Sequence, residues 1–365
     1  MLYIVFNAIK STFLDFLRIR RKPRILQLPI TGKCNSRCVT CNVWKFTEKN
    51  DIDPVLLRQV LKDRYLNKVA HVGVNGGELT QCHNFGEIIE SILTLPRIKS
   101  ISAISNGIFT NKLLERLAVM YKLCKERDVF LSVTLSIDGV GKIHDYVRGI
   151  NGSFEKTISS LRRIMDDRNK YCDIVNVGCT ISRFNVFYLS VLDVLLKKNN
   201  IPVEYHIAVP NKRIATFNDA ERYSLLSDDR ARLMAIEFFF SKMHDVQESR
   251  LKRINYYLQL YYLMNNGEGR LFNCSFKYRD ITIDENLLLY LCATASDCIG
   301  DLKKAKIKEF KRNGKLKKIE RQVEPNCEYC IHYAWLPNIS GLFLYIKHVL
   351  KDRLKIAKFK LLLKL

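Results

Sequence analysis

Short runs of β-branched and aliphatic residues alternate with amphipathic stretches over residues 24–209, and this alternation restricts the fold more than any other feature of the chain. The runs predict strands at residues 24–30, 69–74, 100–105, 130–137, 174–180 and 203–209, with helices near 53–68, 84–95, 110–127, 153–168 and 185–200. Strands joined by helical crossovers pair in parallel, with right-handed connections. We therefore expect an α/β fold, an open (β/α)6 barrel whose site lies at the carboxyl ends of its strands.

Three cysteines follow the first predicted strand directly, in the spacing C-x3-C-x2-C: Cys34, Cys38 and Cys41. Three thiolates on one short loop can ligate three irons of a 4Fe–4S cluster and leave the fourth iron open to a small molecule. A zinc site and buried free thiols are the alternatives. Zinc usually takes four protein ligands arranged as two pairs, so the number and spacing favour the cluster.

Glycine and polar motifs follow the next three predicted strands, at the same edge of the expected barrel. Two glycines allow close approach of the backbone to a ligand, and a carboxylate can accept hydrogen bonds from an ammonium group. Plain turn and cap chemistry is the alternative, above all for Asp138 and His144. The motifs are Asn75-Gly76-Gly77-Glu78, Ser105-Asn106-Gly107, Ser136-Ile137-Asp138-Gly139 and His144-Asp145-Tyr146-Val147-Arg148-Gly149.

The order of these motifs resembles the radical S-adenosylmethionine (radical SAM) superfamily, from which Thr40 and Leu79 are mild departures. The resemblance implies a 4Fe–4S cluster on Cys34, Cys38 and Cys41 that binds S-adenosylmethionine and cleaves it reductively to a 5′-deoxyadenosyl radical. By the same resemblance Arg148 pairs with the carboxylate of S-adenosylmethionine. The cofactor-binding residues that it implies are Gly76, Gly77, Glu78, Ser105, Asn106, Ser136, Asp138 and Arg148.

A second group of cysteines follows residue 265, and residues 281–292 alternate enough to predict a hairpin with Asn286 in a left-handed turn. This region resembles the C-terminal SPASM module, or the shorter twitch module, of some radical SAM enzymes. The resemblance implies an auxiliary 4Fe–4S cluster; structural zinc is the alternative. Cys298 is a further cysteine that could be the ligand in place of Cys292. The implied ligands are Cys274, Cys292, Cys327 and Cys330.

The net charge of +23 is concentrated at both ends of the chain. Residues 1–24 hold six basic residues and one acidic, and residues 301–365 hold 17 basic and 6 acidic. Ordinary helices packed on the barrel are one explanation; contact with anionic lipid or a phosphate-bearing substrate is the other. No aromatic-rich motif accompanies the charge, so we expect no nucleic-acid partner. On a helical wheel one side of the first segment is apolar: Leu2, Phe6, Ile9, Phe13, Phe16 and Leu17.

Five regions are expected. They are a basic amphipathic segment at 1–24, the barrel at 25–210, a helical insertion at 211–265, the auxiliary module at 266–335 and a basic helix at 336–365. Polar residues interrupt the apolar N-terminus, which argues against a signal peptide, and no uncharged apolar stretch reaches the length of a membrane span. The clustered cysteines favour a reducing cytoplasm, with peripheral contact at the inner membrane face as a further expectation.

The resemblance implies an oxidoreductase that oxidises or epimerises a carbohydrate or other small metabolite, with a reductant such as flavodoxin or ferredoxin. A maturase acting on a ribosomal peptide is the alternative, although only 24 residues precede the first strand, too few for a peptide-recognition domain. A two-cluster electron carrier is a third interpretation, under which the cofactor-binding motifs would have no purpose. The sequence does not reveal the catalytic acid or base.

Overall fold

The computed structural model describes residues 2–17, 20–216, 218–332 and 337–362, and only the backbone of residues 2, 3, 11, 15 and 352–362. Its strands form one nine-stranded sheet in the order β6-β5-β4-β3-β2-β1-β7-β8-β9. The strands are β1 Ile25–Pro29, β2 His71–Asn75, β3 Ser100–Ser105, β4 Phe130–Ser136, β5 Ile174–Ile181, β6 Val203–Ile207, β7 Ile281–Ile283, β8 Leu288–Tyr290 and β9 Gly300–Asp301.

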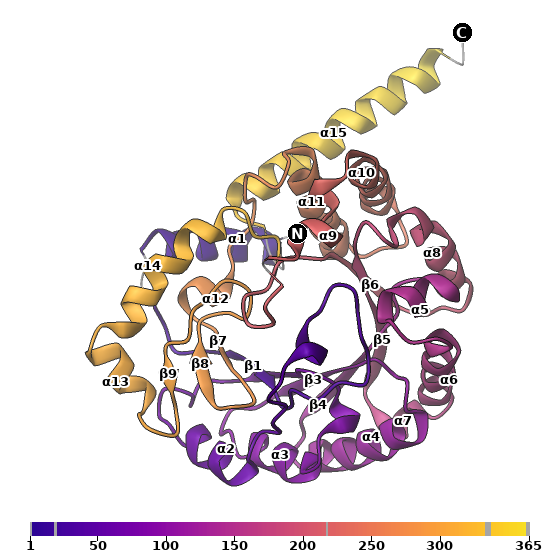
Figure 1. Cartoon of the computed structure of the whole chain (residues 1–365). Coiled ribbons are helices and arrows are strands. Elements are labelled where there is room, and N and C mark those ends of the chain that lie inside the picture. Colours follow the sequence, from indigo (N-terminus) through magenta and orange to yellow (C-terminus); the bar gives the residue numbers. More distant parts are fainter. Residues whose placement is uncertain (1, 18–19, 217, 333–336, 363–365) are drawn as a thin grey trace.

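The first six strands are parallel throughout and follow chain order across the sheet, as predicted. Each coincides with a predicted strand to within a few residues. Buried residues alternate with accessible ones along β3, β4 and β6. Helices cover the outside of the curved sheet (Figure 1), so the accessible residues, such as Ile104 and His206, face the interior. The barrel therefore has a lined interior that solvent can reach.

Helices surround the sheet on its outer side and close the rest of the circle (Figure 1). Residues 211–265, expected to hold two helices, form mainly α10 and α11. The helices are α1 Leu2–Phe16, α2 Pro54–Leu61, α3 Phe85–Ile92, α4 Thr110–Lys125, α5 Lys142–Arg148, α6 Ser153–Asp166, α7 Arg168–Tyr171, α8 Leu189–Lys198, α9 Ala220–Tyr223, α10 Asp229–His244, α11 Arg250–Met264, α12 Ser275–Tyr278, α13 Ile307–Arg312, α14 Lys315–Cys327 and α15 Ile339–Leu362.

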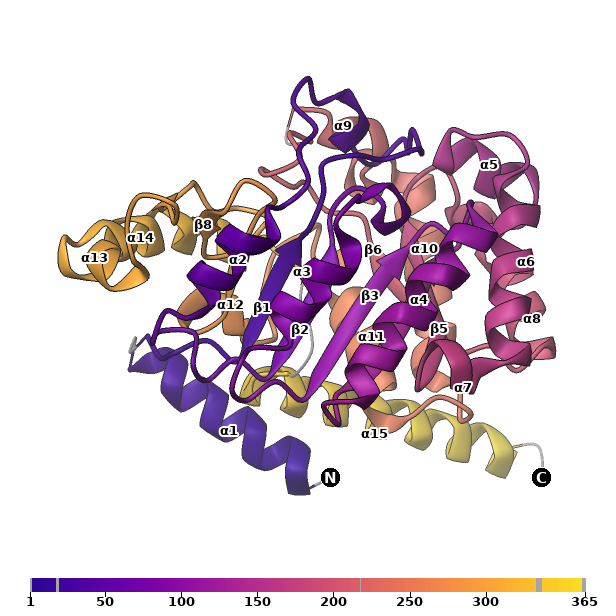
Figure 2. The same cartoon turned by 90° about the horizontal axis from the view of Figure 1, so that it is seen from below.

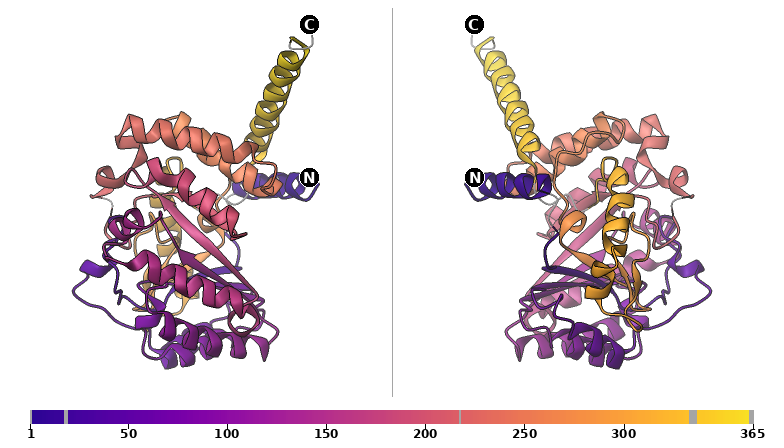
Figure 3. Two further views of the ribbon diagram at one scale, coloured as in Figure 1. Left: turned by 90° about the vertical axis from the view of Figure 1, so that its right-hand side faces the viewer. Right: turned by 90° about the vertical axis from the view of Figure 1, so that its left-hand side faces the viewer.

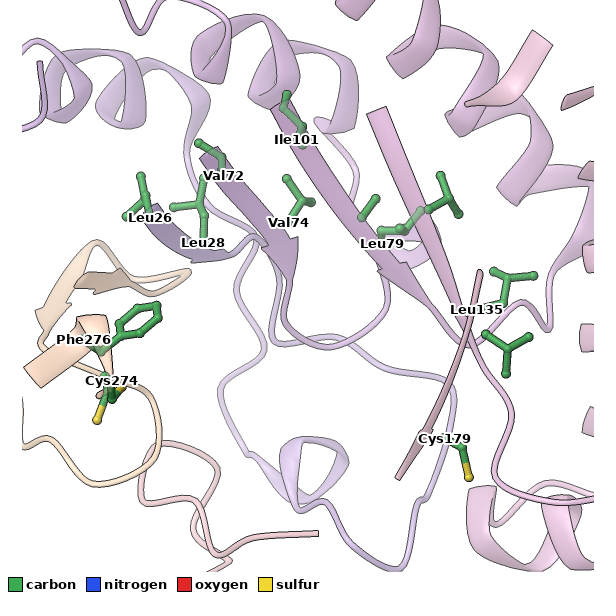
Figure 4. Close-up of a cluster of buried hydrophobic side chains, with 14 of the residues drawn as sticks. Leu26, Leu28, Val72, Val74, Leu79, Ile101, Leu135, Cys179, Cys274 and Phe276 are labelled. Carbon is green, nitrogen blue, oxygen red and sulfur yellow. The ribbon is translucent and has the colours of Figure 1, made fainter. Parts of the chain in front are cut away.

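The C-terminal segment extends the barrel sheet directly. β7 pairs in parallel with β1, and β8 and β9 continue the sheet in antiparallel fashion. Cys274 and Phe276 belong to the same apolar core as side chains from β1 and β2 (Figure 4). The second group of cysteines is therefore joined to the strand from which the first cysteine loop leaves.

The turn of the predicted hairpin differs from the prediction by one residue. Leu287, and not Asn286, takes the left-handed conformation, with φ of 61°. The Asp284 carboxylate accepts hydrogen bonds from the backbone N–H groups of Asn286 and Leu288, and its carbonyl accepts from Leu287 N. Burial of the Leu287 side chain in the core offsets the cost of about 1–2 kcal/mol for this backbone conformation.

Asp280 joins the C-terminal segment to the start of β1. Its Oδ1 accepts hydrogen bonds from the backbone N–H groups of Arg24 and Ile25, both at 3.0 Å, and the carboxylate is paired with Arg279. Burial alone would raise the pKa of Asp280, but the hydrogen bonds from Arg279 and Ile25 hold it below its usual value. The charged form of Asp280 therefore stabilises the junction of the two segments.

Both ends of the chain lie at the amino-terminal side of the strands (Figures 2 and 3). In Figure 2, α1 and α15 are at the bottom and the indigo loop that follows β1 is at the top. The two helices pack against each other where they meet. None of the described helices combines the length and the apolar character that a membrane span requires.

The substitution Asp280→Asn should destabilise the folded chain by about 2 kcal/mol, because it weakens hydrogen bonds to a buried charge. The depressed pKa means that this contribution is complete above the ordinary Asp value of about 3.9 and is lost as pH falls through the lower folded-state value. Urea unfolding of both forms should therefore show a difference at pH 7 that shrinks toward acid. Asp229→Asn, at an exposed side chain, is the control. An unchanged midpoint at pH 7 would contradict this role.

Candidate functional site

The cysteine loop, residues 30–42, leaves β1 and crosses the mouth of the barrel (Figure 1). Its thiols at Cys34, Cys38 and Cys41 are half-buried and form no disulfide. The pKa of Cys34 is raised to about 12 and that of Cys41 to about 11, mainly by burial and in part by the neighbouring Cys38. Three adjacent thiols on one loop fit the donor set of a 4Fe–4S cluster with one open iron, whose uptake would release their protons.

The Gly-Gly-Glu motif holds the first part of this loop through its backbone. Gly77 N donates to Thr31 O at 2.7 Å, and Glu78 N donates to Lys33 O at 2.8 Å. A Cβ atom at Gly77 would lie 2.0 Å from Lys33 O. Gly76 has a φ of 122°, and a Cβ there would lie 2.6 Å from Thr31 O. Both glycines are therefore required for the contact between the end of β2 and the cysteine loop.

The Ser-Asn-Gly motif holds the middle of the loop through a side chain. Asn106 Nδ2 donates to Asn35 Oδ1 at 2.8 Å and to Ser36 Oγ at 2.9 Å. Glu78 in turn accepts from Ser105 Oγ at 2.8 Å and from Asn106 N at 2.7 Å. Complete burial raises the pKa of Glu78, although these hydrogen bonds oppose the rise. The motifs after β2 and β3 thus form one buried network beneath the cysteine loop.

The end of α5 holds the last part of the loop. Arg37 N donates to Arg148 O, and Val39 N donates to Val147 O, both at 2.9 Å. Gly149 ends α5 in the left-handed conformation, and a Cβ there would lie 2.4 Å from Arg37 O. Three separate segments that follow strands or helices of the barrel therefore fix the backbone around the three cysteines.

The Arg148 side chain lies beneath the cysteines and is paired within the chain. Its Nη2 is 2.8 Å from Asp138 Oδ2, and its Nη1 donates to Cys38 Sγ at 3.8 Å. Burial opposes the charge of Arg148, but Asp138 and Cys38 outweigh it and raise the pKa of the guanidinium. Asp138 also accepts from Thr180 N, and His144 Nδ1 accepts from Asp138 N, which is the turn chemistry considered for His144. Ser136 is half-buried at the end of β4.

The four C-terminal cysteines lie near one another and near the half-buried Arg270. The pKa of Cys330 is raised to about 12 by burial and then by Cys274, with Cys292 adding to the rise. Burial raises the pKa of Cys274 to about 11 and also raises that of Cys327, and Arg270 opposes part of both rises. Arg270 Nη1 donates to Cys327 O at 2.9 Å. The thiol donors fit a second 4Fe–4S cluster. Within the described residues, no group of three or more His, Cys, Asp or Glu side chains is arranged to hold a metal ion, and this applies to both groups of cysteines.

Cys298 lies apart from this group. It is exposed, and its pKa is raised by burial of part of the thiol and by Asp284. The Cys292 thiol is close enough to Cys274, Cys327 and Cys330 to contribute to the rise in their pKa values, which favours Cys292 as the fourth member of the group.

Residues 211–219 connect the cysteine loop to the C-terminal segment. Asn42 Nδ2 donates to Ala215 O at 2.9 Å, and Arg213 Nη1 is 3.2 Å from Glu285 Oε2 in a buried ion pair. Arg213 is also close enough to lower the pKa of Cys41. Sequence reasoning missed Arg213 and Arg270. Arg270 precedes Cys274 by four residues, which is a usable signal, whereas nothing local marks Arg213.

The model of the Radical SAM superfamily matches residues 28–181, which include the cysteine loop and all three motifs that hold it. Residues 28–181 are a radical SAM domain. Among curated relatives, the GTP 3′,8-cyclase of Pasteurella multocida (strain Pm70) is 30% identical over 174 residues, which cover 40% of this chain and 48% of that protein. The chain thus spans about half the length of such relatives.

Two further proteins resemble this chain. The antilisterial bacteriocin subtilosin biosynthesis protein AlbA of Bacillus subtilis (strain 168) is 27% identical over 141 residues, covering 38% of this chain and 29% of that protein. The solved structure of native anSMEcpe with bound AdoMet and Cp18Cys peptide superposes with a TM-score of 0.60 at 15% identity, covering 92% of this chain and 99% of that chain. The chain therefore has the fold expected from its sequence, a partial radical SAM barrel with a C-terminal segment.

Gly77→Ala should prevent the cysteine loop from holding its cluster, because a methyl group 2.0 Å from Lys33 O must displace the loop. The iron content and visible absorbance of anaerobically reconstituted protein measure this. Gly86→Ala, within α3 and 3.9 Å from the nearest side-chain atom, is the matched control and should retain all its iron. Full iron in the Gly77→Ala protein would show that the contact does not shape the site.

Proposed function

We propose that the chain is a radical SAM enzyme that cleaves S-adenosylmethionine reductively and abstracts hydrogen from a substrate in the barrel mouth. The observation that supports this most is that the cysteine loop is hydrogen-bonded to three places in the barrel. These are the motifs after β2 and β3 and the last residues of α5. A 4Fe–4S cluster held by Cys34, Cys38 and Cys41 would supply the electron for the cleavage.

In this proposal the residues below the loop hold the cofactors in place. Arg148 stabilises the thiolate form of Cys38 by a charge-assisted contact. A hydrogen bond to a sulfur ligand of a cluster raises the reduction potential of the cluster. Arg148 pairs with Asp138 and Cys38 through its two terminal nitrogens, and its Nε has no hydrogen-bond partner in the chain. A contact between Arg148 and the carboxylate of S-adenosylmethionine is therefore kept in the proposal. The space between Glu78 and Ser136 is where we expect S-adenosylmethionine to bind. Glu78 Oε2 accepts one hydrogen bond from the chain and has a second lone pair for the ammonium group.

A second 4Fe–4S cluster on Cys274, Cys292, Cys327 and Cys330 completes the proposal. Arg270, half-buried beside these residues, offsets part of the negative charge of four thiolates. A cluster at this position could take the electron that a substrate radical must lose in a net oxidation. The first cluster would need an external reductant such as flavodoxin or ferredoxin.

A guanidinium nitrogen without a partner near the cysteine loop favours a small anionic substrate, such as a phosphate-bearing saccharide or another phosphorylated metabolite. Arg213 is half-buried, lies near Cys41, and its Nε has no hydrogen-bond partner. A guanidinium nitrogen in this state suits a phosphate or carboxylate oxygen. The name of the Pasteurella multocida relative also indicates a phosphorylated substrate. We favour oxidation or epimerisation of such a metabolite.

Modification of a ribosomal peptide is the second candidate. AlbA takes part, by its name, in the biosynthesis of the bacteriocin subtilosin, and anSMEcpe was solved with a bound peptide. An accessible interior bounded by β3 to β6 would also admit an extended peptide. The two candidates share the radical chemistry and differ in the group that occupies the barrel mouth.

Replacement of Cys34, Cys38 and Cys41 together by Ala should abolish formation of 5′-deoxyadenosine from S-adenosylmethionine under dithionite, because no open iron remains. Chromatographic assay of anaerobically reconstituted protein measures the product. Cys124→Ala, at a buried thiol on α4, is the matched control and should keep the activity. Undiminished 5′-deoxyadenosine from the triple variant would disprove the assignment of the loop.

Iron analysis tests the second cluster. Reconstituted wild-type protein should contain about 8 iron and 8 sulfide per chain, and the triple Cys34, Cys38 and Cys41 variant should retain about 4 of each. Cys298→Ser should leave both numbers unchanged. If the triple variant is colourless and contains about one zinc, the C-terminal site is a zinc site. The proposal that a second cluster accepts an electron would then be wrong.

A further inference from the structure

The helices α1 and α15 each present an apolar stripe to solvent. On α1 the exposed residues recur at steps of three and four, and on α15 they recur at steps of four and three, so each set lies on one face of its helix. Their side chains are between 37 and 81% exposed. The set is Phe6, Ile9, Phe13 and Phe16 on α1, and Ile339, Phe343, Ile346 and Leu350 on α15.

The opposite faces of both helices are already used for packing. Ile4 and Ala8 of α1 are buried, and Thr12 Oγ1 accepts a hydrogen bond from Ile339 N at the start of α15. On α15, Tyr345 is buried and its ring lies 5.6 Å from that of Tyr257 on α11. The apolar side that the helical wheel gave to α1 is thus the side turned to solvent, so packing on the barrel does not explain it.

The charge on α15 is positive, since residues 339–362 hold six Lys and Arg residues and one Asp. On α1, Lys10 and Asp15 balance each other. The described lysines Lys10, Lys347 and Lys351 are exposed. An apolar stripe flanked by lysines matches a helix that lies in the interface of an anionic membrane. A second copy of the chain suits the surface less well, because a twofold contact would bring like-charged patches together in a molecule of net charge +23.

We propose that α1 and α15 together form a docking surface for an anionic lipid bilayer. Both helices project on the same side of the barrel, at the end opposite the cysteine loop (Figures 2 and 3). A bilayer against this surface leaves the mouth of the barrel facing away from the lipid. The docking surface is therefore separate from the proposed substrate site, and it positions the enzyme at the membrane while its substrate enters from the aqueous side.

Co-sedimentation of the full chain with vesicles tests this proposal. The chain should bind vesicles that contain phosphatidylglycerol, bind pure phosphatidylcholine vesicles more weakly, and lose binding as salt shortens the screening length below about 10 Å. The double variant Phe6→Ser, Phe343→Ser should bind at least about tenfold more weakly, since each exposed ring contributes apolar burial. Val191→Ser, Val194→Ser on α8 removes two equally exposed apolar side chains and is the matched control, with binding unchanged.

One further double variant and two further measurements keep the test decisive. Lys10→Gln, Lys347→Gln should weaken binding to the anionic vesicles alone, and circular dichroism should show the native helix content in every variant. Absence of wild-type binding to either vesicle, or equal binding by the Phe6→Ser, Phe343→Ser protein, would overturn the proposal. A dimer in sedimentation velocity that this same double variant dissociates, without vesicle binding, would assign the surface to a second copy instead.

Discussion

The fixed backbone of the cysteine loop is the constraint on which the rest of the site depends. Thiol groups on a free loop would need to be ordered each time a cluster formed, at a cost of about 1–2 kcal/mol of backbone entropy per residue. Here the hydrogen bonds from Gly77, Glu78 and Asn106, together with those to Val147 and Arg148, hold the loop before any metal arrives. Because the partners lie at the ends of different barrel elements, a shift in any of them would move the cysteines.

Continuity of the sheet is the second constraint. The parallel pairing of β7 with β1 and the buried carboxylate of Asp280 join the C-terminal segment to the strand that precedes the cysteine loop. Arg213 and Glu285 bridge the same two parts at the barrel mouth. The two groups of cysteines are therefore carried by one body, and the distance between them does not depend on a flexible linker. An electron acceptor in a fixed position beside a radical site needs such an arrangement.

The sequence was sufficient for the six barrel strands and for the motifs that surround the cysteine loop, whereas β9 was not predicted. Strand positions follow from local runs of β-branched residues. Gly77 stands out because a glycine pair directly after a strand indicates close approach of the backbone to another group. The partners of these motifs were not predictable, since Asn106 meets Asn35 and Ser36 across about seventy residues of sequence. Pairing of Arg148 with Asp138 and Cys38, and the left-handed Leu287, depend on packing that no local pattern encodes.

The central claim is that a cluster held by the three cysteines of the loop has one iron without a protein ligand, to which S-adenosylmethionine binds. A Cys327→Ser, Cys330→Ser variant removes two of the four thiols that would hold the second cluster. The cluster on the cysteine loop is then the paramagnetic centre of the reduced protein. Its electron paramagnetic resonance spectrum should change when S-adenosylmethionine is added, because the cofactor becomes a ligand of that cluster. A spectrum that is identical with and without S-adenosylmethionine would contradict the account.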